Sequence, residues 1–284
     1  MRFDFIAAKK AIYPVTVLCH VLKVRRSGFY AWQDREVSAR AKEDTRLAVE
    51  VRAVYREYKG RYGSPRVWRA FRARGTRICR HRIARLMREQ KLQARRRRRF
   101  VRTTDSNHTL PTPSNVLARE FKVPAPNRAW AADVTYLATR EGWLYLAVLL
   151  DLYSRRVVGW AMSERNDEAL TLSALQMALV QRQPGRGLVH HSDRGTTYAS
   201  GTYQDVLAQH GVVCSMSRKG NCWDNAVVES FFSSLKFECG DGEPFSSRDL
   251  ARRQVTEYIL SFYNPTRLHS YLGYRSPMEF DRAG

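Results

Sequence analysis

The 284-residue sequence contains no long run of apolar residues. Its most apolar stretch, WLYLAVLLDL at residues 143–152, is about half the length of a helix that spans a bilayer. The first ten residues, MRFDFIAAKK, carry charges where a secretory signal peptide has an apolar stretch. These absences argue against a membrane protein and against a secreted one, so we expect a cytoplasmic protein.

Cysteine is scarce as well, with five residues that lie far apart in the sequence. No two of them form a CxxC pair, and an odd number does not suit a framework of disulfides. The spacing therefore indicates neither a zinc site nor a disulfide-stabilised domain, and it favours reduced thiols inside a cell.

Acidic residues are also few, since 27 Asp and Glu stand against 49 Lys and Arg, which gives a net charge of +22. Residues 1–116 contain 30 basic and 9 acidic residues, whereas the rest of the chain contains 19 and 18. The excess indicates a polyanionic partner, either nucleic acid or an anionic membrane surface, and the lack of an apolar segment favours nucleic acid. A polybasic run followed by an aperiodic Thr-, Ser- and Pro-rich stretch predicts a linker at residues 95–120.

The basic half is predicted to be helical, and its first module is placed at residues 1–60. A short apolar-periodic helix near residues 14–22 precedes a turn and a second short helix, with Ser27 as its N-cap. A longer amphipathic helix is expected from Ser38 to Tyr58, because apolar residues recur there at intervals of three and four.

A second helix–turn–helix module is predicted at residues 61–94. Ser64 is a candidate N-cap followed by a proline in the first turn, and Gly75 is a candidate end of that helix. The next helix, near residues 80–90, combines an apolar stripe with arginines suited to DNA phosphates and guanine edges. These arginines are Arg80, Arg82, Arg85 and Arg88. The alternative for each helix is a bundle with a solvated basic face.

The polybasic run after this module consists of Arg95, Arg96, Arg97, Arg98 and Arg99. It is a candidate for an arm that grips phosphates, a localisation-like segment or a solvated linker. Only the first of these interpretations follows from the charge of the neighbouring helices.

The second half of the chain predicts an α/β domain with a mixed sheet at residues 121–240, followed by a C-terminal helix and tail at residues 241–284. Residues 130–137 alternate between two faces, and residues 143–152 have the nearly continuous apolar character of a central strand. Further strands are expected near residues 156–162, 188–191 and 212–216, and helices near residues 167–181, 198–209 and 224–238.

Three carboxylates of this domain are candidates for one site. Asp133 lies in the middle of an apolar strand, where a charge is costly unless it is paired or binds a metal. Asp193 ends another strand, close to a glycine, and Glu229 lies on the polar face of the last helix. On that face Glu229 and Lys236 are also compatible with a surface salt bridge. Together, three carboxylates suit two Mg²⁺ ions in phosphoryl transfer, with Mn²⁺ as a substitute, because oxygen ligands disfavour Zn²⁺.

Several stretches resemble the DDE transposase and integrase family with a ribonuclease-H-like core. The segments WAADVTYL, HHSDRGTTYAS and GNCWDNAVVESFFSSLKFE contain Asp133, Asp193 and Glu229, with 35 residues between the last two. The closing YNPTRLHSYLGYRSPMEF and the N-terminal blocks YPVTVLCHVLKVRRSGFYAW and YGSPRVWRAF resemble the OrfB-type catalytic protein of the IS-three insertion-sequence family. The resemblance extends over nearly the whole chain.

This resemblance implies a transposase that binds element ends, cuts DNA with water and joins strands by attack of a 3′-hydroxyl. The three carboxylates would be the metal ligands, and Lys236 and Asn225 would contact DNA, with Arg218 and Lys219 of the preceding loop as further candidates. It also implies double-stranded DNA as partner, a homo-oligomer on DNA and an OrfA partner or fusion. The zinc module of retroviral relatives has no counterpart in this sequence.

Other polar residues near these motifs have simpler interpretations. Asp151 is expected to cap a turn or to pair with Arg155 or Arg156, and Asp224 to cap a helix. His190 and His191 are expected to be buried structural residues, with a role beside the carboxylates as the alternative, and His269 is expected to be structural. Two rival functions remain at this point, namely a degenerate DNA-binding regulator and a metal nuclease that only hydrolyses DNA.

Overall fold

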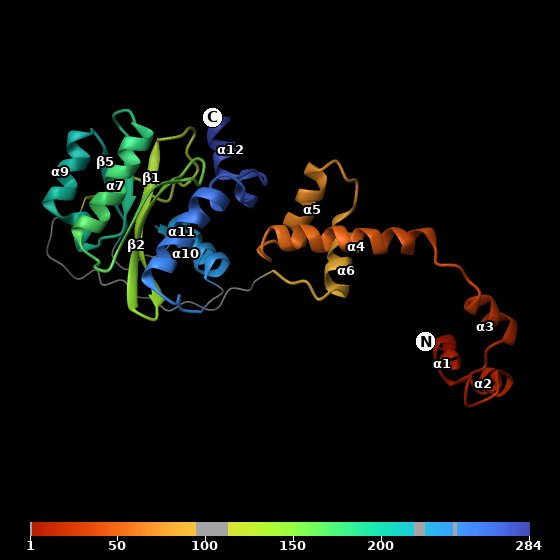
Figure 1. Cartoon of the computed structure of the whole chain (residues 1–284). Coiled ribbons are helices and arrows are strands. Elements are labelled where there is room, and N and C mark those ends of the chain that lie inside the picture. The colour runs from red at the N-terminus through yellow and green to blue at the C-terminus, as the bar shows by residue number, and fades with distance from the viewer. Residues whose placement is uncertain (1, 95–112, 219–224, 241–242) are drawn as a thin grey trace.

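The computed structural model describes residues 2–94, 113–218, 225–240 and 243–284 (Figure 1). The predicted basic arm at Arg95–Arg99, Lys219 and Asp224 lie outside these ranges. No helix within the described ranges is long and apolar enough to cross a bilayer.

The first three helices are α1 (Arg2–Lys9), α2 (Val15–Val21) and α3 (Arg26–Gln33). They pack around a small core of their own that contains Ile6, Leu18, Cys19 and Phe29. The prediction that Ser27 caps the third helix is wrong, because the N-cap is Arg25 and the serine lies inside the first turn.

Helices α4 (Ala39–Glu57), α5 (Ser64–Ala73) and α6 (Arg80–Glu89) form a second group. Ser38, the predicted start of this helix, is the N-cap of α4 and accepts a hydrogen bond from the amide of Ala41. Gly63, not Ser64, precedes α5, and Pro65 occupies its first turn. The apolar stripe of α4 is buried against α5 and α6 rather than against α1–α3.

The second half of the chain forms a five-stranded mixed sheet, as predicted. Its strands are β1 (Ala129–Thr139), β2 (Gly142–Asp151), β3 (Val157–Ser163), β4 (Val189–Ser192) and β5 (Val213–Met216). Their order is β3-β2-β1-β4-β5, with antiparallel pairing among β1, β2 and β3. Strand β4 runs parallel to both β1 and β5.

Helices cover both faces of this sheet. One face packs against α7 (Glu168–Arg182) and α9 (Gly201–Gln209), and the other against α10 (Ala226–Cys239) and α11 (Arg248–Glu257). The predicted helix at residues 198–209 is two helices, α8 (Thr196–Ala199) and α9, because Ser200 is extended and caps the second one. Beyond α11 the tail forms the π-helix η2 (Tyr258–Tyr263), the 3₁₀ turn η3 (Ser270–Leu272) and α12 (Pro277–Arg282), which is more helix than the sequence predicts.

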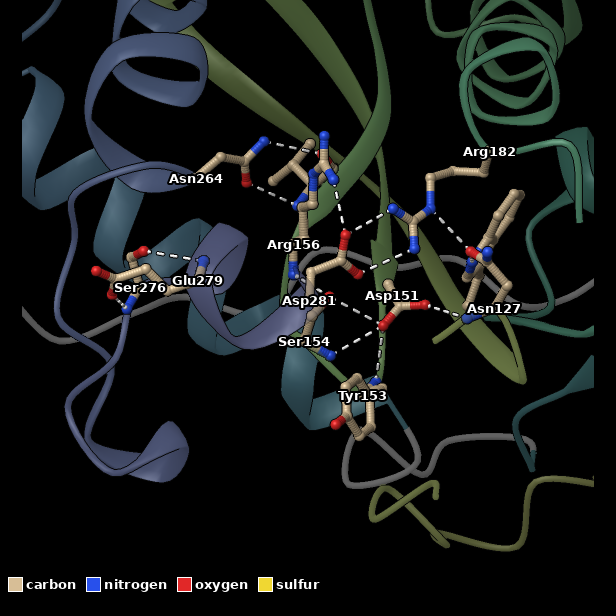
Figure 2. Close-up of polar contacts among 12 residues, drawn as sticks. Asn127, Asp151, Tyr153, Ser154, Arg156, Arg182, Asn264, Ser276, Glu279 and Asp281 are labelled. Atoms are coloured by element: carbon tan, nitrogen blue, oxygen red, sulfur yellow. Dashed lines mark hydrogen bonds and ion pairs between the residues drawn. The ribbon is translucent and has the colours of Figure 1, made fainter. Parts of the chain in front are cut away.

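A buried polar network fastens the C-terminal helix to the sheet (Figure 2). The carboxylate of Asp281 in α12 accepts hydrogen bonds from Arg156 at 2.7 Å and from Arg182 at 2.7 and 2.9 Å. Arg182 also donates to the side-chain oxygen of Asn127, and the main-chain amide of Asn127 donates to the carboxylate of Asp151. Hydrogen bonds from Arg182 and Arg156 outweigh the loss of solvation and lower the pKa of Asp281.

Asp151 therefore has the structural role expected from the sequence. Its carboxylate accepts hydrogen bonds from the amides of Tyr153 and Ser154 and from the hydroxyl of Ser154, and it organises the turn between β2 and β3. The residue is completely buried.

Candidate active site

The register of the parallel strands brings two of the predicted carboxylates together. Residues Ala129–Ala131 of β1 pair with residues 189–191 of β4, so that Ala131 lies opposite His191. Asp133 and Asp193 each follow two residues after this last pair, and parallel strands keep equal spacing. Beyond that point β1 pairs with β2 alone in the described part of the chain, and Asp133 lies opposite Val148.

The turn after β4 holds Asp193 through its own main chain. The amide of Gly195 donates a hydrogen bond of 2.9 Å to Oδ1 of Asp193. A Cβ atom at residue 195 would lie only 2.9 Å from the same oxygen, so glycine permits this close approach. Arg194 donates to the carbonyl oxygen of Ser217 at 2.7 Å and joins the loops that follow β4 and β5.

Helix α10 brings Glu229 to the same edge of the sheet. Its apolar side chains are buried against β1 and β2, while Glu229 is exposed in the first turn. The positive end of the helix dipole stabilises a carboxylate at that position. The three acidic residues therefore lie on β1, just after β4 and on α10, and β1 contacts both of the other elements.

Asn225, which is predicted to contact DNA, is buried at the start of α10. Its side chain is only 5% exposed, and its Nδ2 donates to the carbonyl oxygen of Ala132 at 3.1 Å. The amide thus fastens the start of α10 to the unpaired edge of β1, one residue from Asp133. Its Oδ1 is buried without a hydrogen-bond partner among the described residues.

The three carboxylates influence one another electrostatically. Loss of solvation and the negative charge of Asp193 raise the pKa of Asp133 well above its usual value, and Glu229 adds to this effect. A hydrogen bond of 2.8 Å from the amide of Val134 and the positive charge of Lys236 act in the opposite direction. Within the described residues no group of three or more His, Cys, Asp or Glu side chains is arranged to hold a metal ion.

Lys236 lies beside these carboxylates, as the resemblance implies. Its Nζ is 4.5 Å from the centre of the Tyr136 ring, a cation–π distance. Burial lowers the pKa of Lys236, and Asp133 opposes this shift. A cation is therefore placed next to the acidic residues, at the same edge of β1.

The two histidines before Asp193 are buried, as expected for structural residues. His190 forms a hydrogen bond of 2.9 Å with the hydroxyl of Tyr203, and burial lowers the pKa of His190 to about 3. Nδ1 of His191 is 2.9 Å from Oγ of Ser215. The same hydroxyl accepts hydrogen bonds from the main-chain amides of residues 116 and 117. It thereby anchors the segment between the two halves of the chain, and no sequence pattern predicts this contact.

The predicted DNA-contacting arginines of α6 fall into two groups. Arg80 and Arg88 are exposed. Arg82 donates to Asp44 and Glu43 at 2.7 and 2.8 Å, and Arg85 donates to Asp44 and Glu89 at 2.6 and 2.9 Å. These two guanidiniums hold α6 on α4 through Glu43 and Asp44 of α4. Arg218 is exposed just after β5.

Sequence and structure comparisons identify relatives of the whole chain. The Integrase core domain family matches residues 123–222 and again residues 210–277, and the HTH-like domain family matches residues 42–100. A catalytic-core structure of HTLV-2 integrase with magnesium has a TM-score of 0.43 and 16% identity, over 55% of this chain and 97% of that one. A 31 kDa protein of insertion element IS600 from Shigella sonnei is 44% identical over 93% of this chain and 97% of its own length. Transposase InsF of insertion sequence IS3A from Escherichia coli K12 is 43% identical over 99% of this chain and 98% of its own length, and the chain belongs to this IS3 family of transposases.

Proposed function

We propose that Asp133, Asp193 and Glu229 hold divalent metal ions and form the catalytic centre of this transposase. The observation that carries the proposal is the arrangement of the elements, in which Asp133 and Asp193 follow the last β1–β4 pair at equal spacing and α10 with Glu229 packs against β1. Burial first, and then the charges of Asp193 and Glu229, raise the pKa of Asp133. Carboxylates that repel one another in this way offer a favourable place for a cation. Because the donors are all oxygen atoms, Mg²⁺ is the natural ion, with Mn²⁺ as a substitute.

Two ions are what the resemblance to the DDE family implies for this site. Asp133, Asp193 and Glu229 would hold them with their carboxylate oxygens. Bound ions would activate the attacking oxygen and offset the negative charge that develops on the phosphate.

The reaction is strand cleavage by water followed by attack of the freed 3′-hydroxyl on a second phosphodiester. In this proposal Lys236 contacts a DNA phosphate next to the carboxylates, and Asn225 holds α10 in place. Arg80 and Arg88 on α6 and Arg218 beside the active site supply further phosphate contacts. Lys219, the Arg95–Arg99 run, a homo-oligomer on DNA and an OrfA partner or fusion stay predictions from the sequence.

Asp193→Asn tests this function, with Asp205→Asn as a matched control. Asp205 is an exposed residue of α9, so its loss removes the same charge away from the proposed site. Both variants and the wild type are incubated with a labelled element end, a target duplex and Mg²⁺, and cleaved and joined strands are resolved on a gel. We expect Asp193→Asn to lose cleavage and joining while its DNA affinity stays within about twofold of the control. Joining by Asp193→Asn at the control rate would refute the catalytic assignment.

The same experiment separates the rival functions. A non-catalytic regulator would bind the element end, and the wild type would leave every strand intact. A nuclease that only hydrolyses would produce cleaved strands and no joined product, even with a pre-cut end that carries a 3′-hydroxyl. The family assignment and the neighbouring carboxylates favour both reactions.

A further inference from the structure

The segment between α4 and α5 is packed into the catalytic core. Tyr62 is completely buried and stacks on Tyr58 with ring centres 4.1 Å apart. Its ring centre lies 6.1 Å from that of Phe262 in η2. The hydroxyl donates to the carbonyl oxygen of Thr266 at 3.2 Å and accepts the amide of Leu268 at 3.0 Å. In Figure 1 the end of α4 and the start of α5 accordingly lie beside α10 and α11.

A buried carboxylate near the end of α10 is the ionic centre of this contact. Glu238 accepts hydrogen bonds from Arg267 at 2.7 and 2.8 Å and from the Tyr258 hydroxyl at 2.9 Å. Arg66 of α5 approaches within 3.7 Å of the same carboxylate. Arg61 donates to the main-chain carbonyl oxygen of Glu238 at 2.9 Å. The catalytic helix therefore contacts arginines from both halves of the protein.

The arrangement around Glu238 is better suited to orientation than to stability. Its side chain and that of Arg267 are each 6% exposed, and a buried ion pair contributes little net stability because both charges lose their hydration. The module itself contributes directional hydrogen bonds here, from Arg61 to the main-chain carbonyl oxygen of Glu238 and between Tyr62 and residues 266 and 268, and these restrict the angle between the module and α10. Arg61 reinforces that angle, since its guanidinium lies 4.3 Å from the centre of the Phe262 ring.

The position of Glu238 on α10 connects this contact with the catalytic centre. Glu229 and Glu238 are nine residues apart, which is about two and a half turns or roughly 13 Å along a helix. At 100° per residue they lie on opposite sides of the helix, with Glu229 exposed and Glu238 buried. The module therefore contacts α10 on the side opposite Glu229.

We propose that Glu238 is a positioning residue that fixes the α4–α6 helices on α10. DNA held by α6 is thereby presented to the carboxylates at one particular phosphodiester. This inference rests on the proposed function, and it adds a determinant of where the DNA is cut. It assigns Arg66, Arg61 and Tyr62 to the same contact, from the side of the helical module.

Arg66→Met tests the contact without removing the pair between Glu238 and Arg267. Arg74→Met is the matched control, because Arg74 is another arginine of the module and its ion-pair partner, Glu57, belongs to the module as well. The full chain is given an end-labelled element end with Mg²⁺, and both the positions and the single-turnover rates of cleavage are measured. We expect Arg66→Met to spread cleavage over neighbouring phosphates and to slow cutting at the principal one about tenfold, with DNA affinity within twofold of the control.

A further variant keeps the test decisive if Arg66→Met folds poorly. Tyr62→Phe removes only the hydroxyl that contacts Thr266 and Leu268, and it leaves the buried pair between Glu238 and Arg267 intact. It should spread the cleavage positions, while cutting of a random-sequence duplex with Mn²⁺ stays at the wild-type rate.

Three results are informative about the inference. Cleavage by Arg66→Met at the same phosphate and rate as Arg74→Met would overturn it. Loss of random-duplex cutting in the folded variants would also overturn it, because Glu238 would then support the catalytic centre itself. A wild type that cuts neither DNA would instead refute the proposed function, so the two failures are distinguishable.

Discussion

Replacing Gly195 by alanine would place a methyl carbon 2.9 Å from Oδ1 of Asp193, where ordinary van der Waals contact begins at about 3.4 Å. The carboxylate would therefore have to move by about 0.5 Å, and its hydrogen bond from the amide of residue 195 would be lengthened or lost. The main chain itself tolerates alanine, because φ is −64° and ψ is 144° at this position. The perturbation is thus confined to the carboxylate and does not extend to the fold.

The expected effect on catalysis follows from this displacement. A misplacement of about 1 Å near reacting groups can cost about a hundredfold in rate, so half of that distance corresponds to roughly tenfold, or about 1.4 kcal/mol in the barrier. Single-turnover cleavage of a labelled element end with saturating Mg²⁺ measures this quantity directly. Gly201→Ala is the matched control, because a methyl group there would contact nothing within 4 Å. Equal rates for the two variants, with equal melting temperatures, would refute the role assigned to the turn around Asp193.

Three other substitutions test the charges described above. Asp133→Asn should raise the free energy of urea unfolding in the absence of metal, because burial and the neighbouring carboxylates disfavour an ionised Asp133. Added Mn²⁺ should stabilise the wild type and not the variant, and equal stabilisation of both proteins would contradict this. Asp281→Asn should lower the free energy of unfolding by about 2–3 kcal/mol at pH 7, since it leaves buried guanidiniums without their counter-ion. The lowered pKa of Asp281 means that this difference is present above about pH 4 and shrinks as the pH falls through that pKa, so a difference that is constant with pH would count against it. Arg80→Gln should reduce the slope of log affinity against log salt concentration by about 0.9, because one phosphate contact is lost. Arg82→Gln should leave that slope unchanged and destabilise the module. Anisotropy titrations that give equal slopes for the two variants would exclude this distinction.

The sheet was predictable because its strands differ in ways that the sequence records. The stretch at residues 143–152 is apolar on both faces, and β2 is indeed covered by separate hydrophobic clusters on its two sides. The alternation at residues 130–137 likewise matches β1, and Asp133 of this strand lies near α10. These patterns arise from burial, which acts on every residue of a strand.

Helix starts were predicted less well, because a serine near a boundary can be either the cap or part of the first turn. Ser38 does cap α4, whereas Ser27 and Ser64 both lie inside their helices, whose N-cap residues, Arg25 and Gly63, make no side-chain cap hydrogen bond. Helix α1 was not predicted, since Ile6 is its only fully buried residue and short segments give weak periodicity.

The acidic residues of the site were recognised from their motifs, but the residues that hold them were not. The contact between Asn225 and Ala132 joins positions 93 residues apart, and that between Glu238 and Arg267 joins positions 29 apart. Such pairs depend on how the elements pack, which local patterns do not encode. For the same reason the sequence could not separate Arg82, which holds α6 on α4, from Arg80, which is exposed.

The three carboxylates are held by different kinds of constraint, and this difference determines which of them is easiest to displace. Asp133 belongs to a strand that is paired along its whole length with β2, and Asp193 is held by the turn that contacts its own side chain. Glu229 lies on a helix that reaches the sheet through packed side chains, with the amide of Asn225 at its start and Glu238 near its end. Side-chain contacts of this kind rearrange with a smaller loss of free energy than the ladder of main-chain hydrogen bonds that joins β1 to β2. The packing of α10 is therefore the constraint that is easiest to change, and Glu229 is the carboxylate that we expect to be displaced first.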